Sequence, residues 1–183
     1  MNGLLLAGWA FYFFLHSFLA TYAVKNFFSN KLPKFYTYYR LVYNGIAILG
    51  LLVLMPNSLL TISTASHVII GACITCIGLF FRIQAFRVFN LREFLGFSPE
   101  KSTELVVTGM FRYVRHPLYF GTLIFIAGIY LIFPSHTMLG VLILSYTYIL
   151  IGSKLEERKL RNHFGQAYED YAKKVKALIP YVY

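Results

Sequence analysis

Five long apolar stretches dominate this chain and restrict what it can fold into. A helix needs about 20 mostly apolar residues to cross a bilayer, and somewhat fewer inside a helical bundle. The sequence therefore predicts an all-α, multi-span membrane helix bundle. The predicted spans are Gly3–Val24, Leu41–Leu60, His67–Phe86, Leu118–Phe133 and Thr137–Ser153. Only "PSH" separates the last two spans, which favours a helical hairpin turning at Pro134.

Composition supports a membrane protein. The chain is 58% hydrophobic and only 13% charged, whereas soluble domains carry roughly a quarter charged residues. The first apolar stretch has no basic segment before it and exceeds the roughly 7–15 residues of a signal-peptide core, so we expect it to remain as a span. With 183 residues, we expect one domain, 1–183. Residues 1–90 would hold three spans, and 91–183 the motifs and two more spans.

The charges indicate a topology. All 17 Lys and Arg residues lie in three segments, Lys25–Arg40, Arg82–Arg115 and Lys154–Lys176. Five spans place these segments on one side, which the positive-inside rule makes cytoplasmic. The N-terminus is then outside and the C-terminus inside, in an inner membrane if the chain is bacterial. The formal net charge of +10 is explained by topology and anionic headgroups, so no nucleic-acid partner is predicted.

The two cysteines lie in the apolar run "GACITCIGLFF". Redox or zinc chemistry at Cys73 and Cys76 would need a polar, accessible setting. We expect both to pack on a helix face, and we predict no metal.

The stretch "RYVRHPLYFG" places Arg112, Arg115 and His116 against the start of an apolar run. Pro117 suits the first position of a helix, where its missing N–H is not required. His116 would then be the N-cap, beside N–H groups that favour an anion. The alternative is that these basic residues bind lipid phosphates at the membrane boundary. This alternative explains the arginines but not the combination Arg-His-Pro-x-Tyr-x-Gly.

The residue pattern of the C-terminal region predicts an amphipathic helix. Gly165 interrupts this pattern, and we expect it to end one helix before another begins. The apolar positions of the pattern are Leu160, Phe164, Tyr168, Tyr171, Val175 and Leu178. Glu156 and Glu157 stand at the end of the last span, where acidic residues are disfavoured. We expect them to pair with Arg112, Arg115 or His116; pairing along their own helix with Arg158 or Lys159 is the alternative.

Polar side chains also occur within the first three spans. His16 and Ser17 fall in the cytoplasmic half of the first span, and Asn44 near the start of the second. Buried polar groups in spans usually face the bundle or a cavity. A His16–Asn44 contact between helices and a substrate-facing site are both consistent with the pattern. Gln84, in the third span, has the same two readings.

These elements together resemble a known family. Gly109–Gly121, then Glu156-Glu157-x-x-Leu160, Phe164-Gly165-x-x-Tyr168-x-x-Tyr171 and Ile179-Pro180 are similar, in order, to the isoprenylcysteine carboxyl methyltransferases. Phospholipid N-methyltransferases share the Arg-His-Pro-x-Tyr-x-Gly and Glu-Glu elements. "HSFLA" and "YRLVYN" in the N-terminal half are similar to the branch containing NnrU-type proteins and membrane methanethiol methyltransferases.

The resemblance implies a methyltransferase that uses S-adenosyl-L-methionine in a cytoplasmic pocket under C-terminal helices. Arg115 and His116 would hold the cofactor carboxylate, and Glu156 or Glu157 the ribose hydroxyls or the ammonium. Aromatic rings would wall the adenine and favour the sulfonium. The implied cofactor residues are Gly109, Tyr113, Arg115, His116, Pro117, Tyr119, Gly121, Glu156, Glu157, Leu160, Phe164, Tyr168 and Tyr171. The implied catalytic residues are Arg115, His116 and Glu157, and the substrate candidates are His16, Asn44 and Gln84.

The acceptor is left open by the sequence. An isoprenylated cysteine, a phospholipid amine, a small thiol and a quinone-like lipid all fit a lipid bilayer setting. A thiol or ammonium would need proton removal, for which Glu157 or His116 is nearest. A membrane NAD(P)H-dependent reductase is an alternative from another class, because sterol reductases have a similar Arg-His-Pro-x-Tyr element. A non-enzymatic scaffold is a third, and it leaves the paired glutamates without a purpose.

Overall fold

A computed structural model describes residues 3–59, 62–88 and 105–179, and within these ranges the chain is helical with no β-strand. An isolated parallel bridge joins Val114 to Lys176. The all-α prediction is confirmed for this part of the chain. The helices are α1 (Gly3–Ala20), α2 (Tyr22–Lys31), α3 (Pro33–Ser58), α4 (Ala65–Val88), η1 (Gly109–Arg112), α6 (Pro117–Ile132), α7 (His136–Phe164) and α8 (Gln166–Lys174).

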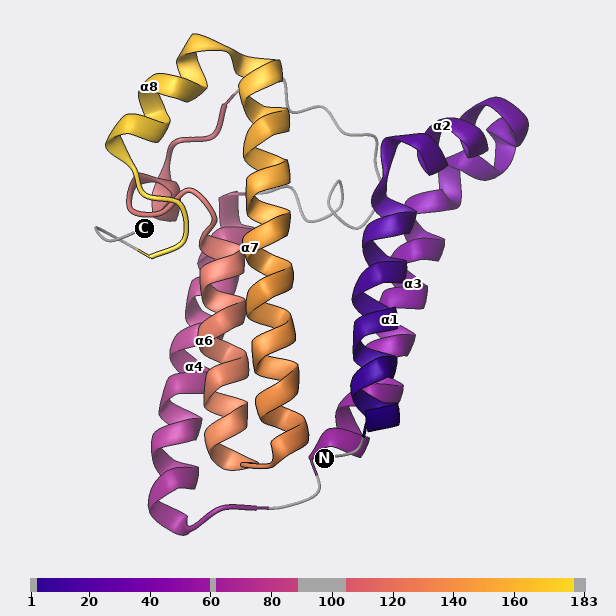
Figure 1. The fold of residues 1–183 in the computed structure, drawn as a ribbon. Coiled ribbons are helices and arrows are strands. Elements are labelled where there is room, and N and C mark those ends of the chain that lie inside the picture. Colours follow the sequence, from indigo (N-terminus) through magenta and orange to yellow (C-terminus); the bar gives the residue numbers. More distant parts are fainter. Residues whose placement is uncertain (1–2, 60–61, 89–104, 180–183) are drawn as a thin grey trace.

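The long helices lie side by side and alternate in direction (Figure 1). Three of the described helices, α1, α4 and α7, are long and apolar enough to cross a membrane. The Leu41–Met55 part of α3 and helix α6 are shorter apolar helices. Helices α2 and α8 lie at the same end of the bundle as the start of α6 (Figure 1), so the described basic segments gather at that end.

One expected boundary is wrong. The first span was expected to reach Val24, but α1 ends at Ala20. Thr21 has extended backbone angles, φ −66° and ψ 150°, and its hydroxyl accepts from the Val24 amide, which starts a separate helix. The last predicted span ends at Ser153, and α7 continues beyond it through the charged residues to Phe164, as the amphipathic pattern before Gly165 predicts.

Helices α4 and α6 are packed tightly through glycines. An added Cβ at Gly78 would lie 2.4 Å from the Phe125 amide nitrogen, and one at Gly128 would lie 2.3 Å from Thr75 Oγ1. Small residues allow such close backbone approach where both helices are surrounded by lipid. Gly121 belongs to the same crossing, with its Cβ position 2.8 Å from the Gly78 carbonyl oxygen. This close packing explains why position 121 is a glycine, which the sequence motif alone did not show.

Helices α1 and α3 form a second pair, which contacts α7. The indole of Trp9 donates to Ser58 Oγ at 3.0 Å, and Trp9 packs with Met138 and Val141 in a buried cluster. Cys73 and Cys76 lie on the helix α4, but both are free and exposed, so the packing expected on this helix face is not observed.

Candidate active site

The Arg-His-Pro turn sits between η1 and α6 and is attached to the C-terminal segment. His116 is the N-cap of α6 and Pro117 opens the helix, as predicted. The backbone N–H groups of Arg115 and His116 donate to the carbonyls of Lys176 and Ala177, at 2.8 and 3.0 Å. These two donors are therefore used by the protein itself. The segment that follows α8 is held against the turn.

The Arg115 guanidinium joins three parts of the chain. Its Nε and Nη2 donate to Glu157 Oε1 at 3.0 and 2.5 Å. Its Nη1 donates to the carbonyl of Ala172 at 3.0 Å and to that of Val175. Arg115 thus connects the start of α6, the end of α7 and the C-terminus of α8.

His116 lies between the two glutamates, as expected from the sequence. Its Nε2 is 3.4 Å from Glu157 Oε1, and its Nδ1 is 3.7 Å from Glu156 Oε2. The side chains of His116 and Glu157 are 4% and 12% exposed, whereas that of Glu156 is 45% exposed. The ring stacks on Tyr119, with centroids 5.4 Å apart. Glu156 is therefore the carboxylate of the pair that remains accessible.

Glu157 lies beyond the apolar part of α7, and its carboxylate is held ionised. Burial opposes the charged form, but hydrogen bonds from His116 and Arg115 and the charge of Arg115 outweigh burial and lower the pKa to about 2. Arg161 lies one turn later on α7, and its Nη2 is 3.7 Å from Glu157 Oε2. Glu157 therefore acts as the fixed anion of the cluster.

Helix α8 covers the cluster because the chain reverses at Gly165. The φ of this residue is +54°, a backbone conformation that favours glycine, and Gly165 ends α7 and begins α8 as predicted. Tyr168 is buried under α8, and burial, aided by nearby Glu157, raises its pKa to about 12. The Tyr171 hydroxyl donates to the Phe111 carbonyl at 2.6 Å. Arg161 and Glu169, 3.0 Å apart, join α7 to α8.

A polar pocket of about 240 Å³ opens beside this cluster. Arg115 and Glu157 form part of its wall, and Lys154 and Lys176 place two further cations around it. The full lining is Arg115, Ser153, Lys154, Glu157, Ala172, Lys176 and Ala177. The pocket can accept a small, charged ligand. Within the described residues no group of three or more His, Cys, Asp or Glu side chains is arranged to hold a metal ion.

The structure brings most of the predicted cofactor residues to one end of the bundle. Arg115, His116, Pro117 and Tyr119 come from the turn and the start of α6. Glu156, Glu157, Leu160 and Phe164 come from the end of α7, and Tyr168 and Tyr171 from α8. Gly109 has a φ of +59° and starts η1. Tyr113 is 53% exposed, and Arg112 is exposed as well.

Two of the substrate candidates, His16 and Gln84, form side-chain hydrogen bonds. His16 contacts Tyr148 on α7, with Nδ1 3.0 Å from the hydroxyl, and the Ser17 hydroxyl donates to the same Tyr148 oxygen at 3.0 Å. These contacts join α1 to α7, which is consistent with a contact between helices, one of the two interpretations of His16. Gln84 accepts from Arg87 on its own helix at 3.3 Å. Tyr148, Lys154 and Lys176 were missed, because no local pattern shows that they meet these groups.

Comparison with known proteins identifies the family. The family model described as phospholipid methyltransferase matches residues 66–167, more than half of the chain, and the chain belongs to this family. The region includes the Arg-His-Pro turn and both glutamates. The chain is 35% identical over 107 residues to the methanethiol S-methyltransferase of Crocosphaera subtropica, covering 56% of this chain and 40% of that protein.

Two further relatives carry other names. A probable protein-S-isoprenylcysteine O-methyltransferase of Oryza sativa subsp. indica is 35% identical over 85 residues, covering 45% of this chain and 44% of its own. The nickel-cobalt-cadmium resistance protein NccN of Alcaligenes xylosoxydans xylosoxydans is 33% identical over 86 residues, covering 47% and 40%. The chain thus spans less than half the length of these relatives. No solved structure matches it.

Proposed function

We propose that this chain transfers the methyl group of S-adenosyl-L-methionine to an acceptor at the cytoplasmic face of a membrane. The proposal rests on a cluster of charged side chains at one end of a bundle of apolar helices. The cluster contains Arg115, His116, Glu156 and Glu157. These residues lie within the region that matches a methyltransferase family. This family membership favours methyl transfer over the reductase and scaffold alternatives.

The proposed topology keeps the single domain 1–183, five spans, an outside N-terminus and a cytoplasmic C-terminus. α3 and α6 would be the second and fourth spans, packed inside the bundle, where a shorter apolar length suffices. The basic ends of α2, α4 and α8 share one end of the bundle (Figure 1), which supports a cytoplasmic cap made by α8. In a bacterium the membrane would be the inner one.

The residues at this end suit S-adenosyl-L-methionine. Lys154 and Lys176 offer ammonium groups to a carboxylate, and the accessible Glu156 can accept from an ammonium or ribose hydroxyls. Tyr171 and Phe164 supply rings for a purine and a sulfonium. We do not assign Arg115 to direct carboxylate binding, because four of the five N–H groups of its guanidinium already donate to Glu157 and to two carbonyls. We assign it as a positioning residue that holds α8 over the pocket.

The chemistry then depends on positioning and on one proton. When bound, S-adenosyl-L-methionine supplies an electrophilic methyl group, which an acceptor lone pair takes as the electrons of the broken carbon–sulfur bond return to sulfur. Excluding water and aligning the acceptor are the main tasks of the surrounding side chains. Glu157, with its pKa lowered to about 2, is a poor base. His116 is therefore the better group to take a proton from a thiol or ammonium acceptor.

A direct assay tests this function. The purified full-length chain is incubated with methyl-labelled S-adenosyl-L-methionine and, separately, methanethiol, dodecanethiol, S-farnesylcysteine and phosphatidylethanolamine. We expect labelled product with at least one acceptor, and its loss in Glu156→Gln. Asp170→Asn is the matched control, since Asp170 is an exposed acid that bonds to Gln166 and Lys173 on its own helix α8 and does not line the pocket. No transfer to any acceptor by a protein that remains folded would contradict the proposal.

A further inference from the structure

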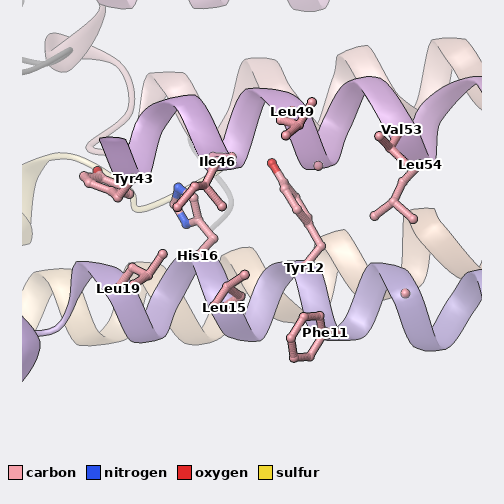
Figure 2. A pocket seen from close by; sticks show the side chains of 13 residues that line it. Phe11, Tyr12, Leu15, His16, Leu19, Tyr43, Ile46, Leu49, Val53 and Leu54 are labelled. Carbon is pink, nitrogen blue, oxygen red and sulfur yellow. The ribbon is translucent and has the colours of Figure 1, made fainter. Parts of the chain in front are cut away.

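Charged side chains are almost absent from the apolar helices. The five predicted spans together contain a single Lys, Arg, Asp or Glu residue, Arg82, in the third span. The pocket of about 390 Å³ between α1 and α3, by comparison, is lined by apolar side chains with His16 and two tyrosines (Figure 2), and no Lys, Arg, Asp or Glu is found among the described residues that line it. A charge inside a span is costly unless a group of opposite charge accompanies it. The surroundings of Arg82 therefore indicate what that group is.

Arg82 lies at the crossing of α4 and α6, beside the glycine of the Arg-His-Pro-x-Tyr-x-Gly motif. A Cβ atom at Gly121 would lie 3.0 Å from Arg82 Cγ, so the lack of a side chain at Gly121 gives the arginine room. The guanidinium carbon of Arg82 lies 5.2 Å from the centroid of the Phe125 ring, one turn farther along α6. This cation–π contact holds the guanidinium against α6. It does not neutralise the charge.

The Arg82 guanidinium has no anionic partner in the described part of the chain. Its Nε is buried without a hydrogen-bond acceptor, and none of the described residues forms a hydrogen bond or an ion pair with Nη1 or Nη2. Because Arg82 is partly exposed, these two terminal nitrogens are the atoms that a ligand can reach. Their N–H groups form a planar fork that fits two oxygens of one anionic group.

The surface next to Arg82 is apolar. Leu79 and Ile83, its neighbours on α4, are 44% and 47% exposed, and Cys76, one turn before Leu79, is exposed as well. Helix α4 is long and apolar enough to cross a membrane. An exposed apolar strip thus runs along this helix from the cation toward the middle of the span.

The depth of Arg82 also matters. It precedes Val88, the last residue of α4, by six positions, a rise of about 9 Å. This end of α4 is the end of the bundle at which α2 and α8 lie (Figure 1). The cation is therefore nearest to that end, and the apolar strip leads away from it. A phosphate followed by an acyl chain has the same order of groups.

We propose that Arg82 binds the phosphate of an anionic phospholipid in the leaflet at the α2 and α8 end of the bundle. Nη1 and Nη2 donate to two phosphate oxygens, and an acyl chain lies along Leu79 toward Cys76. A small soluble anion would use the cation but not the strip. The lipid stabilises the α4–α6 crossing and is not the methyl acceptor. Arg82 does not line the polar pocket, so this site is independent of the proposed methyl transfer.

Native mass spectrometry of the detergent-purified full-length protein tests the site, with dioleoylphosphatidylglycerol as the probe. We expect Arg82→Gln to bind this lipid about tenfold more weakly than the wild type, because the charge-assisted hydrogen bonds to phosphate are lost. Arg87→Gln is the matched control, since it removes the same charge from an exposed position of the same helix, where Arg87 bonds to Gln84. Its affinity should stay within about twofold of the wild type. Equal affinities in the two variants would overturn the proposal.

Measurements on the wild type keep the test independent of how well a variant folds. Dioleoylglycerol, which has the same chains and no phosphate, should bind at least about tenfold more weakly than dioleoylphosphatidylglycerol. Dioleoylphosphatidylcholine, whose head group brings a second cation, should also bind more weakly, and millimolar sodium phosphate should not displace the bound lipid. Equal binding of dioleoylglycerol or dioleoylphosphatidylcholine would contradict recognition of an anionic phosphate. Displacement by sodium phosphate would assign the site to a soluble anion and would overturn the proposal as well.

Discussion

Arg115→Lys should release the C-terminal segment while leaving the charge of the site unchanged. Lysine cannot reproduce the guanidinium fork, which binds Glu157 with two nitrogens and the carbonyls of Ala172 and Val175 with a third. Losing two of these hydrogen bonds, at about 1 kcal/mol each, lowers the local stability by about 2 kcal/mol. A loss of about 2 kcal/mol raises the population of the locally open state about thirtyfold. Amides that exchange only through this local opening should therefore exchange about thirtyfold faster.

The assay is hydrogen–deuterium exchange of the cofactor-free protein, followed by mass spectrometry of peptides from α8 and the segment after it. The amides of Arg115 and His116, which donate to that segment, should exchange faster as well. Arg112→Lys, at an exposed position of η1, should change neither region. Unchanged exchange in Arg115→Lys together with weakened S-adenosylhomocysteine binding would refute the positioning role and favour direct contact between Arg115 and the cofactor.

Three further predictions follow from the geometry. The pKa of Glu157 lies below its usual 4.5, at about 2, so its ion pairs stabilise the folded state above pH 4.5. This stability is lost as the pH falls toward 2. When the protection of the α8 amides from hydrogen exchange is measured against pH, it should fall over this range in the wild type but not in Glu157→Gln. Gly128→Ala should lower the thermal stability in detergent by about 2 kcal/mol through overpacking, because the new Cβ meets Thr75 at 2.3 Å; Gly152→Ala, in open space, should not. Gly165→Ala should cost about 1 kcal/mol or more and free α8, since its φ is +54°; unchanged α8 protection would contradict this.

The sequence predicts well where a local pattern determines the structure. Pro117 with His116 before it defines the start of α6, and Gly165 defines the break between α7 and α8, since each depends on the backbone preferences of one or two residues. The pairing of Glu157 with Arg115 was also predictable, because a carboxylate at the end of an apolar helix needs a cation and the sequence offers few candidates on the same side of the membrane. Membrane topology and individual cofactor contacts stay predictions.

Contacts between distant segments were less predictable. The bridge between Val114 and Lys176 joins two stretches without strand periodicity, and the N–H groups of Arg115 and His116 donate to the same C-terminal segment. His16 meets Tyr148 across 132 positions of sequence, and nothing near either residue indicates the other. The role of Gly121 in close helix packing is equally hidden, because a glycine in a motif reads the same whether it faces a ligand or a helix.

Calorimetric binding of S-adenosylhomocysteine to the detergent-purified chain tests the central claim most directly, with Glu156→Gln, Asp170→Asn and NADPH as comparisons. The account predicts micromolar binding to the wild type and to Asp170→Asn, loss of binding in Glu156→Gln, and no heat from NADPH. Heat from NADPH with none from S-adenosylhomocysteine would contradict it, as would binding that survives in Glu156→Gln unchanged.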